Sequence, residues 1–470
     1  AGFGLWIQEL FPELESNGVW VLDRLKQTNA ELIDELSGMI GDYCQIHPSQ
    51  RAKNEDDARA IAKIAQWNEL IKNYEELYSL VMDKSGVIDI PEREPSTLHE
   101  LDSVALKRKS NDPVWKNVVI ESSLPDELAG LEELAKNLWW SWNYEAEELF
   151  CAIDPELWEE VEHNPVKLLK QVPYNRLQDL GKHGDFFHQY KGVLESFNSY
   201  MNKKEDKDQP KIAYLSMEYG FHSSLKIYSG GLGILAGDYL KEASDCNYQL
   251  TGIGLLYRYG YFKQVLTLHG DQVAENMREE FTELPLYPML DEKGKNLQIQ
   301  IAFPGRIVSA RIWRVPVGRV NLFLLDTDIE SNQAHDRLLT SNLYGGDEEH
   351  RLKQEMLLGV GGIRMLELLG IKADIFHCNE GHAAFIGFER IKQLMETKNF
   401  TFNESREVIR ASTLFTTHTP VPAGHDAFHE DLIRTYMGHY PDRLKIAWEE
   451  FTDLGRKVPG DHNEKFSMSH

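Results

Sequence analysis

Histidine, carboxylate and amide side chains gather in two short stretches of the second half of the chain, where their types and spacing could support chemistry. The stretch "HCNEGH" contains Asn379, Glu380 and His382, and "THTPVPAGH" contains His418. A His-Cys-x-x-x-His spacing suggests a metal site, but these ligands would compete for space and no second Cys/His cluster follows at metal-site spacing. The residues therefore predict hydrogen bonding to a polar substrate and no metal, with helix capping by Asn379 or Glu380 as the alternative.

Two further interpretations stay open for single residues. His418, at the end of an apolar run, either orients a substrate or is a satisfied structural histidine, and the two prolines that follow it break helical register before the next histidine. The acidic stretch "GGDEEH" contains Asp347. This stretch either gates a site as a flexible loop or complements the N-terminus of the helix that follows.

The stretch "YSGGLGILAGDYLKEASD" places glycines immediately before a helical pattern. Gly231, Gly233 and Gly237 give G-x-G-x-x-x-G, one residue longer than the dinucleotide fingerprint, and the acidic residue expected about 20 positions later is missing. A Walker loop is excluded because no G-K-[ST] follows. What remains is either a set of backbone amides that can hold a phosphate or sugar hydroxyls, or a tight packing turn.

Short β-rich runs alternate with helical patterns from residue 211 onward. The runs are "KIAYLSME", "YQLTGIGLLY", "IVSARIWRVPV", "VNLFLLDT", "ADIFHCNE" and "STLFTTHT". This alternation predicts a parallel sheet in a doubly wound α/β domain. Ligands of such sheets bind beyond the carboxyl ends of the strands, which is where "SMEYG", "CNEGH" and "THTPVPAGHDAF" lie. These motifs are therefore expected to converge on one edge of the sheet.

The first half of the chain is expected to be mainly helical. Residues 19–80 carry apolar residues at three- and four-residue intervals, which predicts helices. A linker is expected at 83–113 and a short strand at 115–125, before an aromatic-rich helical region that runs to about residue 203. Three tryptophans of this region form either a sugar-stacking platform or, as we favour, a core between helices. They are Trp139, Trp140 and Trp142.

The bulk composition narrows the class of protein. With 470 residues the chain can form two or three domains, and 42% apolar and 27% charged residues are typical of a soluble globular protein. A formal net charge of −25 disfavours nucleic acid and anionic membranes as partners. The 4 cysteines are widely spaced, which argues against a disulfide framework and favours a reducing cytosol. No apolar run approaches the ~20 residues of a membrane span.

The order and spacing of the motifs are more specific than any one of them. "YLSMEYG", "YSGGLGILAGDYLKEASD", "YGYFKQ", "LYGGDEEHRLKQE", "NEGHAAF" and "THTPVPAGHDAF" resemble the N-terminal half of a bacterial-type α-glucan phosphorylase, from about residue 116 to the end. The resemblance implies a Rossmann-like N-terminal lobe of a two-lobed GT-B glycosyltransferase fold. It also implies pyridoxal 5'-phosphate as cofactor, and transfer of a terminal α-1,4-linked glucose of an α-1,4-glucan to inorganic phosphate, giving glucose 1-phosphate.

The same resemblance implies roles for several residues. Gly230, Gly231 and Leu232 match a loop whose amides face the substrate phosphate and the sugar. Glu218 matches a cleft-facing glutamate, and His418 matches the histidine that contacts the glucosyl unit at the reacting site.

Other roles implied by the resemblance concern the acidic and polar turns. Asp347 matches the acidic residue of a mobile loop that guards the active site. Asn379, Glu380 and His382 match a polar turn near the glucan-binding region, where the family usually has Asp in place of Glu380. The lysine that anchors the cofactor belongs to the family's second lobe, and no matching segment occurs before His470. The resemblance therefore implies half an active site, with neither a Schiff base nor turnover of its own.

The first 82 residues are similar to the C-terminal end of large-type glycogen synthases, with a W-x-x-L-x-x-x-Y helix around Trp67. Together the two resemblances suggest a synthase–phosphorylase fusion or two merged reading frames. The expected regions are a helical tail at 1–82, the linker, a helical domain at 114–203 and the Rossmann-like lobe at 204–470. The family is commonly oligomeric, and a cytoplasmic location is expected.

Two other functions stay open from the sequence. One is a noncatalytic glucan-binding module, and the other is a nucleotide-sugar glycosyltransferase of the same two-lobed fold. Release of glucose 1-phosphate that depends on phosphate would separate the phosphorylase from both, and consumption of a nucleotide sugar without phosphate would favour the transferase.

Overall fold

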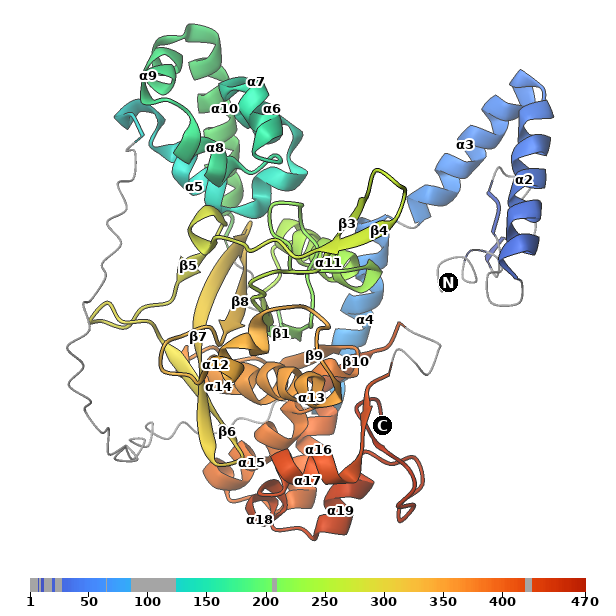
Figure 1. Cartoon of the computed structure of the whole chain (residues 1–470), viewed down its shortest axis with the longest axis vertical. Coiled ribbons are helices and arrows are strands. Elements are labelled where there is room, and N and C mark those ends of the chain that lie inside the picture. Colours follow the sequence, from blue (N-terminus) through green and yellow to red (C-terminus); the bar gives the residue numbers. More distant parts are fainter. Residues whose placement is uncertain are drawn as a thin grey trace.

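The computed structural model describes residues 28–64, 66–85, 124–204, 209–418 and 425–470, together with residues 7, 10, 11 and 19–21. Its central feature is an eight-stranded sheet in the order β10-β9-β1-β2-β8-β7-β5, with β6 paired to β7 (Figure 1). The strands are β1 (Ile212–Leu215), β2 (Leu250–Leu255), β5 (Tyr287–Pro288), β6 (Gln298–Phe303), β7 (Arg306–Val317), β8 (Val320–Asp326), β9 (Ile375–Asn379) and β10 (Thr413–Thr416).

All six β-rich runs of the sequence form strands of this sheet. Five of them, β10, β9, β1, β2 and β8, are parallel neighbours, which confirms the predicted parallel sheet. The sixth, β7, is antiparallel to β8. Only Gly318 and Arg319 separate β7 from β8, and a connection of two residues can form a hairpin but not the crossover that parallel strands need.

Helices cover both faces of the sheet around β2. Successive residues of a strand point to opposite faces. A Cβ at Gly252 would meet Leu240 of helix α11 at 2.8 Å, whereas Ile253 lies 3.0 Å from the Cβ position of Gly362 in α14. Because neither face is left to solvent, the central strands are apolar along their length, and every residue of β1 is buried.

The helices of this lobe follow the strands in the order typical of a doubly wound domain. They are α11 (Gly231–Asp245), α12 (Ala334–Arg337), α13 (Glu348–Met356), α14 (Gly362–Leu368), α15 (Ile386–Lys398), α16 (Phe402–Ala411), α17 (Glu430–Met437), α18 (Tyr440–Leu444) and α19 (Trp448–Asp453). A π-helical turn, η6 (Leu357–Gly361), joins α13 to α14. Two small ribbons complete the lobe: β3 (Lys263–Leu266) with β4 (Gln272–Glu275), and β11 (Ala427–Phe428) with β12 (Phe466–Ser467).

A separate helical unit precedes the lobe and has its own core. Its helices are α5 (Gly130–Lys136), α6 (Tyr144–Ile153), α7 (Pro155–Glu160), α8 (Pro165–Gln171), α9 (Tyr174–Lys182) and α10 (Gly184–Met201). Trp139 and Trp140 are buried in this core, and half-buried Trp142 donates its Nε1–H to Asp245 of α11 at 3.3 Å. The tryptophans are therefore packing residues and do not form a sugar-stacking platform.

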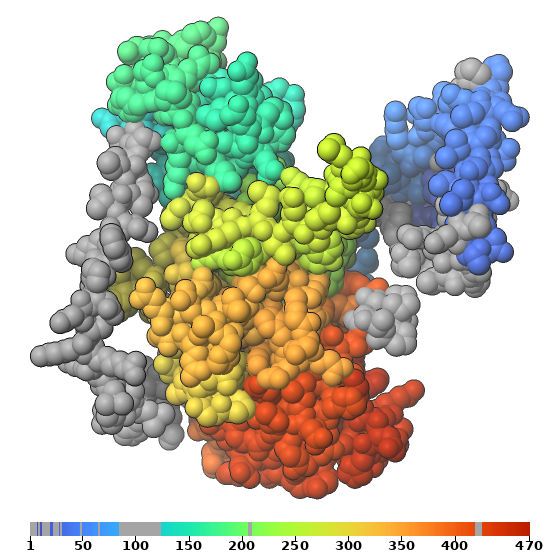
Figure 2. Space-filling view, in the orientation of Figure 1, coloured from blue at the N-terminus to red at the C-terminus, as the bar shows by residue number. Residues whose placement is uncertain are grey.

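The N-terminal helices divide between two environments. They are α2 (Asn29–Gln45), α3 (Pro48–Ile64) and α4 (Trp67–Ser85). Figures 1 and 2 show α2 and α3 projecting away from the body of the molecule. In contrast, Ile71, Tyr78 and Val81 of α4 are buried in the main core of the lobe, and the Tyr78 hydroxyl lies 2.6 Å from His377 Nδ1 on β9.

Some sequence predictions fall outside the described residues. One is the strand expected at 115–125, of which only residues 124 and 125 are described, without regular structure. The other is most of the linker at 83–113, of which only the first three residues are described, as the end of α4. The helical pattern from residue 19 onward begins as helix at Asn29, since residues 19–21 have no regular structure. Within the described residues, no helix is both long and apolar enough to cross a bilayer, and all four cysteines are free thiols.

Candidate sugar and phosphate site at the carboxyl edge of the sheet

The carboxyl ends of β1, β9 and β10 lie at one edge of the sheet, and each strand continues into a polar turn. Asn379 ends β9, and its Oδ1 is 2.7 Å from Nε2 of His418, two residues beyond β10. Asn379 Nδ2 donates to Ser216 Oγ at 3.1 Å, directly after β1. One amide side chain thus connects three motifs that are far apart in the sequence, and the expected convergence of these motifs is confirmed.

Glu380 holds the backbone at His418. Its φ of 69° is a conformation that a glutamate rarely adopts, and such backbone strain concentrates at functional sites. The Glu380 carboxylate accepts the backbone N–H of His418 and, at 3.3 Å, the hydroxyl of Thr417. No side chain caps the short helix η7 (Gly381–Ala383) that follows. The alternative that Asn379 or Glu380 is a helix cap is therefore wrong.

The bond to Asn379 selects one form of the His418 imidazole. Burial lowers the pKa of His418 below its ordinary value, against the opposing effect of the Glu380 carboxylate, so the ring is neutral at pH 7. Because the accepting atom is the carbonyl oxygen of Asn379, the proton is assigned to Nε2 and Nδ1 keeps its lone pair. His418 can therefore accept a hydrogen bond from a sugar hydroxyl through Nδ1.

Glu218, three residues past β1, accepts hydrogen bonds from the backbone of the glycine stretch. The side chain is buried, and its Oε2 accepts the backbone N–H groups of Ser229 at 2.6 Å and Gly230 at 3.2 Å. Its Oε1 accepts the hydroxyl of Tyr344 at 2.7 Å. The amide of Gly230, which the resemblance places against a phosphate or sugar, is thus already paired inside the protein.

The first turn of α11 presents two backbone amides. Within the part of the chain that the structure describes, the N–H groups of Gly231 and Leu232 have no protein acceptor, because a helix satisfies none of its first amides. A Cβ at Gly231 would meet nothing within 4 Å, so this side of the helix start is open. The two amides and the helix dipole favour an anion or a hydroxyl oxygen at this position.

The other two glycines of the motif serve packing. A Cβ at Gly237 would lie 2.0 Å from the carbonyl oxygen of Gly220, and one at Gly233 would lie 2.5 Å from Tyr228 Cβ. These glycines let α11 approach the turn after β1, where Gly220 N donates to Gly233 O at 2.7 Å. The packing interpretation is therefore confirmed for Gly233 and Gly237, and binding of a phosphate or sugar hydroxyls at the start of α11 stays a prediction.

Asp347 is the N-cap residue of α13. Its Oδ1 accepts the backbone N–H of His350 at 2.9 Å, and the side chain is exposed. Of the two roles considered for this acidic stretch, the geometry shows the one that complements the helix N-terminus. A gating role for Asp347 stays a prediction.

A charged cluster adjoins this site, and of its members the sequence had indicated only His382. Its members are Tyr344, Arg351, Glu355, His382 and Asp426. The Arg351 guanidinium pairs with the Asp426 carboxylate and lies 4.4 Å from the centroid of the Tyr344 ring. A usable signal was present, because "RLKQE" places Arg351 and Glu355 four residues apart on one helix face.

His382 lies beside this cluster with one ring nitrogen unused. Its Nε2 is 3.5 Å from Asp426 Oδ2. Burial, and after it the charge of Arg351, lowers the pKa of His382 to about 4, so the ring is neutral at pH 7. Among the described residues, His382 Nδ1 and Arg351 Nη1 have no hydrogen-bond partner. Buried polar atoms without partners are rare, and two of them at one sheet edge indicate a polar ligand.

The side chains at this edge limit the cofactor groups that it could hold. In the described ranges, no group of three or more His, Cys, Asp or Glu residues could hold a metal ion. Pyridoxal phosphate needs a lysine amine as its anchor, and the cluster described above contains no lysine. Lys353, the lysine nearest in sequence to Arg351, pairs with Glu349 at 2.7 Å. This edge therefore suits a phosphate group through its amides but not the aldehyde anchor of the cofactor.

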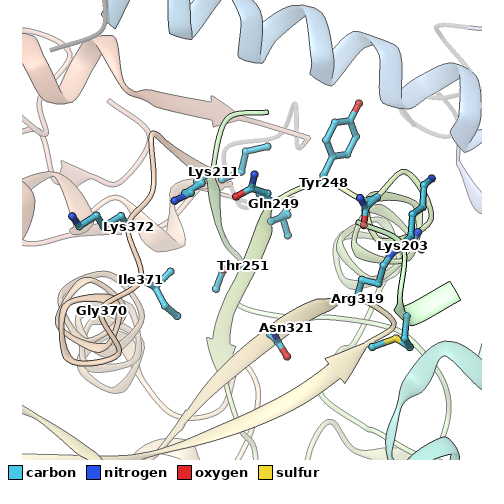
Figure 3. A pocket seen from close by; sticks show the side chains of 14 residues that line it. Lys203, Lys211, Tyr248, Gln249, Thr251, Arg319, Asn321, Gly370, Ile371 and Lys372 are labelled. Carbon is cyan, nitrogen blue, oxygen red and sulfur yellow. The ribbon is translucent and has the colours of Figure 1, made fainter. Parts of the chain in front are cut away.

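A polar cavity of about 400 Å³ lies at the opposite edge of the sheet from the site described above. Lys203, Lys211, Arg319 and Lys372 line it near the amino ends of β1, β2 and β8. Figure 3 shows the Lys203 side chain on the other side of the pocket from Lys211 and Lys372, so the three do not converge. Arg319 is committed to the backbone carbonyls of Tyr200, Ser244 and Asp245. Arg319 thereby complements the dipoles at the C-termini of α10 and α11, and the four cations define no ligand site.

The structure is that of an α/β protein whose polar motifs meet at the carboxyl edge of a parallel sheet. A protein-family profile described as a protein of unknown function (DUF3417) matches residues 124–225. The chain is 47% identical over 357 residues to a maltodextrin phosphorylase of Thermococcus litoralis, which covers 74% of this chain and 42% of that protein.

Similar values are found for two bacterial relatives. A glycogen phosphorylase of Mycobacterium tuberculosis is 40% identical over 379 residues, covering 76% of this chain and 44% of the relative. A glycogen phosphorylase of Aquifex aeolicus is 39% identical over 345 residues, covering 72% of this chain and 49% of the relative. The chain thus spans less than half of the length of each of these curated relatives.

Proposed function

We propose that this chain forms the glucan- and phosphate-facing part of an α-glucan phosphorylase, which transfers a terminal α-1,4-linked glucose to inorganic phosphate and releases glucose 1-phosphate. One observation carries the proposal: a hydrogen-bonded chain leads from His418 through Asn379 and Ser216 to Glu218, and from Glu218 to the glycine stretch before α11. A polar turn for sugar hydroxyls and an open helix start for phosphate are thereby fixed relative to each other. The names of the similar proteins support the same substrate class.

Each end of this hydrogen-bonded chain has a role in the proposal. The amides of Gly231 and Leu232 hold a phosphate oxygen at the start of α11, where the helix dipole adds to their attraction. Neutral His418 accepts a glucosyl hydroxyl through Nδ1. Preorganised amides of this kind also stabilise negative charge next to a sugar centre that becomes positive as the glycosidic bond breaks. Glu218 and Glu380 accept hydrogen bonds from the backbone N–H groups of Gly230 and His418, and so hold the glycine stretch and His418 in position.

The proposal also covers the cofactor, the N-terminal helices and the partners. The lysine that anchors pyridoxal phosphate is proposed to lie in a second lobe of the GT-B arrangement, whereas the sheet edge of this chain binds the glucan and the phosphate. The N-terminal helices, with their similarity to glycogen synthase, would make it part of a fused polypeptide. The proposed partners are α-1,4-glucan, inorganic phosphate and glucose 1-phosphate. The protein is proposed to be cytoplasmic and to form a homo-oligomer.

The test measures glucose 1-phosphate released from maltoheptaose by the natural full-length polypeptide with pyridoxal phosphate, with and without inorganic phosphate. Release is expected only with phosphate. The His418→Asn variant should lose about 100-fold or more of kcat/KM, the size expected when one preorganised hydrogen-bonding group is removed from a reacting centre. A matched control is His188→Asn, since His188 is exposed on α10 and far from the site in the sequence.

Three outcomes would contradict the proposal. Glucose released without phosphate would indicate a hydrolase. Consumption of a nucleotide sugar without phosphate would indicate the transferase. Maltoheptaose binding with no product under any condition would indicate a noncatalytic glucan-binding module.

A further inference from the structure

Glu355 carries a fully buried carboxyl group and is a member of the charged cluster. It lies on α13 with 0% of its surface exposed. Among the described residues, neither Oε1 nor Oε2 receives a hydrogen bond from a donor group. Arg351 Nη2 is 3.9 Å from Oε1, beyond hydrogen-bond distance, and is paired instead with Asp426 Oδ2.

These contacts do not suit an ionised Glu355. A buried carboxylate without hydrogen-bond donors loses its hydration. The Arg351 guanidinium, 3.9 Å from Oε1 and paired with Asp426, offsets only part of that loss, so the charged form is disfavoured. A protonated Glu355 has one O–H to donate, and the neighbouring Asp426 carboxylate is an acceptor for it. A hydrogen bond from a neutral acid to a carboxylate is short and strong because the acceptor is charged.

We infer that Glu355 is a protonated acid that donates its O–H to Asp426 and thereby positions Asp426 between Arg351 and His382. Burial raises the pKa of Glu355 well above its ordinary value. Burial alone would also raise the pKa of Asp426, but the hydrogen bond from Glu355 and the charge of Arg351 bring it below its ordinary value. The pair therefore holds one proton, on Glu355.

This arrangement fixes the two unpartnered atoms at the site. Neutral His382 directs Nε2–H toward Asp426, which leaves Nδ1 as a buried acceptor. Arg351 uses Nη2 for Asp426, which leaves Nη1 as a buried donor. Glu355 is a positioning residue for both, because it acts through Asp426 and touches neither atom itself.

The charge balance around the pair depends on the Glu355 proton. The other charged or titratable groups that face it come from several elements. They are Arg351 on α13, Tyr344 in the turn before α13, Glu380 and His382 after β9, and His425 next to Asp426. Arg351 is a guanidinium cation that pairs with Asp426. Ionisation of Glu355 would add a third carboxylate to those of Asp426 and Glu380 around this cluster, so it would loosen the cluster.

Infrared spectroscopy of the carboxyl groups tests the inference directly, in the full chain and without glucan. A protonated carboxyl gives a C=O band that is separate from ionised carboxylates. We expect one such band at pH 7, shifted by carboxyl ¹³C-labelling of glutamate and absent from E355Q. The control E348Q should retain the band, because Glu348 is an exposed residue of the same helix that pairs with Lys465.

The pH dependence of stability gives a second readout. Since the pKa of folded Glu355 is raised, its contribution to stability is full below the ordinary value of 4.5 and is lost as pH rises toward the folded pKa. E355Q keeps a neutral donor at every pH, so the stability of wild type relative to E355Q should fall between pH 5 and pH 8, with a linkage of about one proton.

Two results would overturn the inference. One is a wild-type protein with no glutamate acid band at pH 7, which needs no variant to be folded. The other is a stability difference between wild type and E355Q that stays constant from pH 5 to pH 8. Neither measurement involves a glucan or phosphate, so failure here is distinct from failure of the proposed function.

Discussion

At the scale of single residues, buried acceptors hold the site together. Glu218 accepts four hydrogen bonds that start on two different segments, the glycine stretch and the turn before α13. Glu380 does the same for the backbone beyond β10. Because a buried donor without an acceptor is costly, such carboxylates fix the local backbone more strongly than exposed ones.

Substitutions of Glu218 should separate its hydrogen bonds from its charge. Glu218→Ala leaves two backbone N–H groups and the Tyr344 hydroxyl without an acceptor and should cost about 2–5 kcal/mol of unfolding free energy. Glu218→Gln keeps one carbonyl oxygen for the amides, and its NH₂ can donate to the Tyr344 hydroxyl, so it should cost about 1 kcal/mol. Urea unfolding gives both values. The control Glu195→Ala, exposed on α10, should stay within about 0.5 kcal/mol; equal losses in all three variants would refute the role of Glu218.

At the scale of elements, α11 carries two kinds of glycine on one helix. Gly237 sits where the helix meets the turn after β1, with a Cβ position 2.0 Å from a backbone oxygen. Gly231 sits at the open start, with no atom within 4 Å of its Cβ position. Close packing and ligand access are thus divided between the two ends of the same motif.

Alanine substitutions of these glycines should behave differently. Gly237→Ala forces α11 away from the sheet and should cost about 1–3 kcal/mol or more, as overpacking does. Gly231→Ala meets no obstacle and should change the unfolding free energy by less than about 1 kcal/mol. Chemical denaturation of both variants side by side measures the contrast, and a Gly231→Ala loss as large as that of Gly237→Ala would contradict the open helix start.

At the scale of the whole molecule, α4 joins the lobe although the chain between them is long. Tyr74 packs against Tyr239 with ring centroids 4.6 Å apart and the ring planes tilted by 34°, and the Tyr78 hydroxyl contacts Tyr239 and His377. The His377 ring in turn reaches Thr416 of β10 at 2.6 Å. The N-terminal helical segment therefore supports the strands β9 and β10, whose ends carry the site.

Two isoleucines test whether α4 is part of the lobe. Ile71 is 3% exposed in the main core, whereas Ile33 on α2 is 63% exposed. Ile71→Ala should lower the unfolding free energy of the lobe by about 2–5 kcal/mol, and Ile33→Ala should change it by less than about 0.5 kcal/mol. Hydrogen exchange of the β1 and β9 amides reports on the lobe itself. Unchanged exchange in Ile71→Ala would show that α4 contributes nothing to it.

Local patterns were sufficient for the parts of the fold that depend on neighbours in sequence. Alternation of apolar runs with helical periods located β1, β2, β8, β9 and β10. The central strands are apolar along their length because both of their faces are buried, whereas β10 at the end of the sheet is partly exposed. Their polar ends located Asn379 and His418, because parallel strands bring their carboxyl ends to one edge. The direction of β7 was not predicted, although the two-residue hairpin after it could have indicated an antiparallel pair.

Contacts between distant segments were beyond these patterns. Arg351, Glu355 and Asp426 come from a helix and a later loop, and their meeting depends on how α13 packs at the sheet edge. The roles of Asn379 and Glu380 also needed the structure, because capping and cross-strand bonding use the same polar atoms.

The sequence by itself determined the strands, the helices and the edge at which polar motifs gather, since periodicity and chain direction are local properties. Only the tertiary structure decided which atoms at that edge are already paired and which are open. It paired Gly230 with Glu218, left the amides of Gly231 and Leu232 open, and enclosed Glu355 without a donor. The physical reason is that burial and hydrogen-bond partners are set by segments that meet only after the chain has folded.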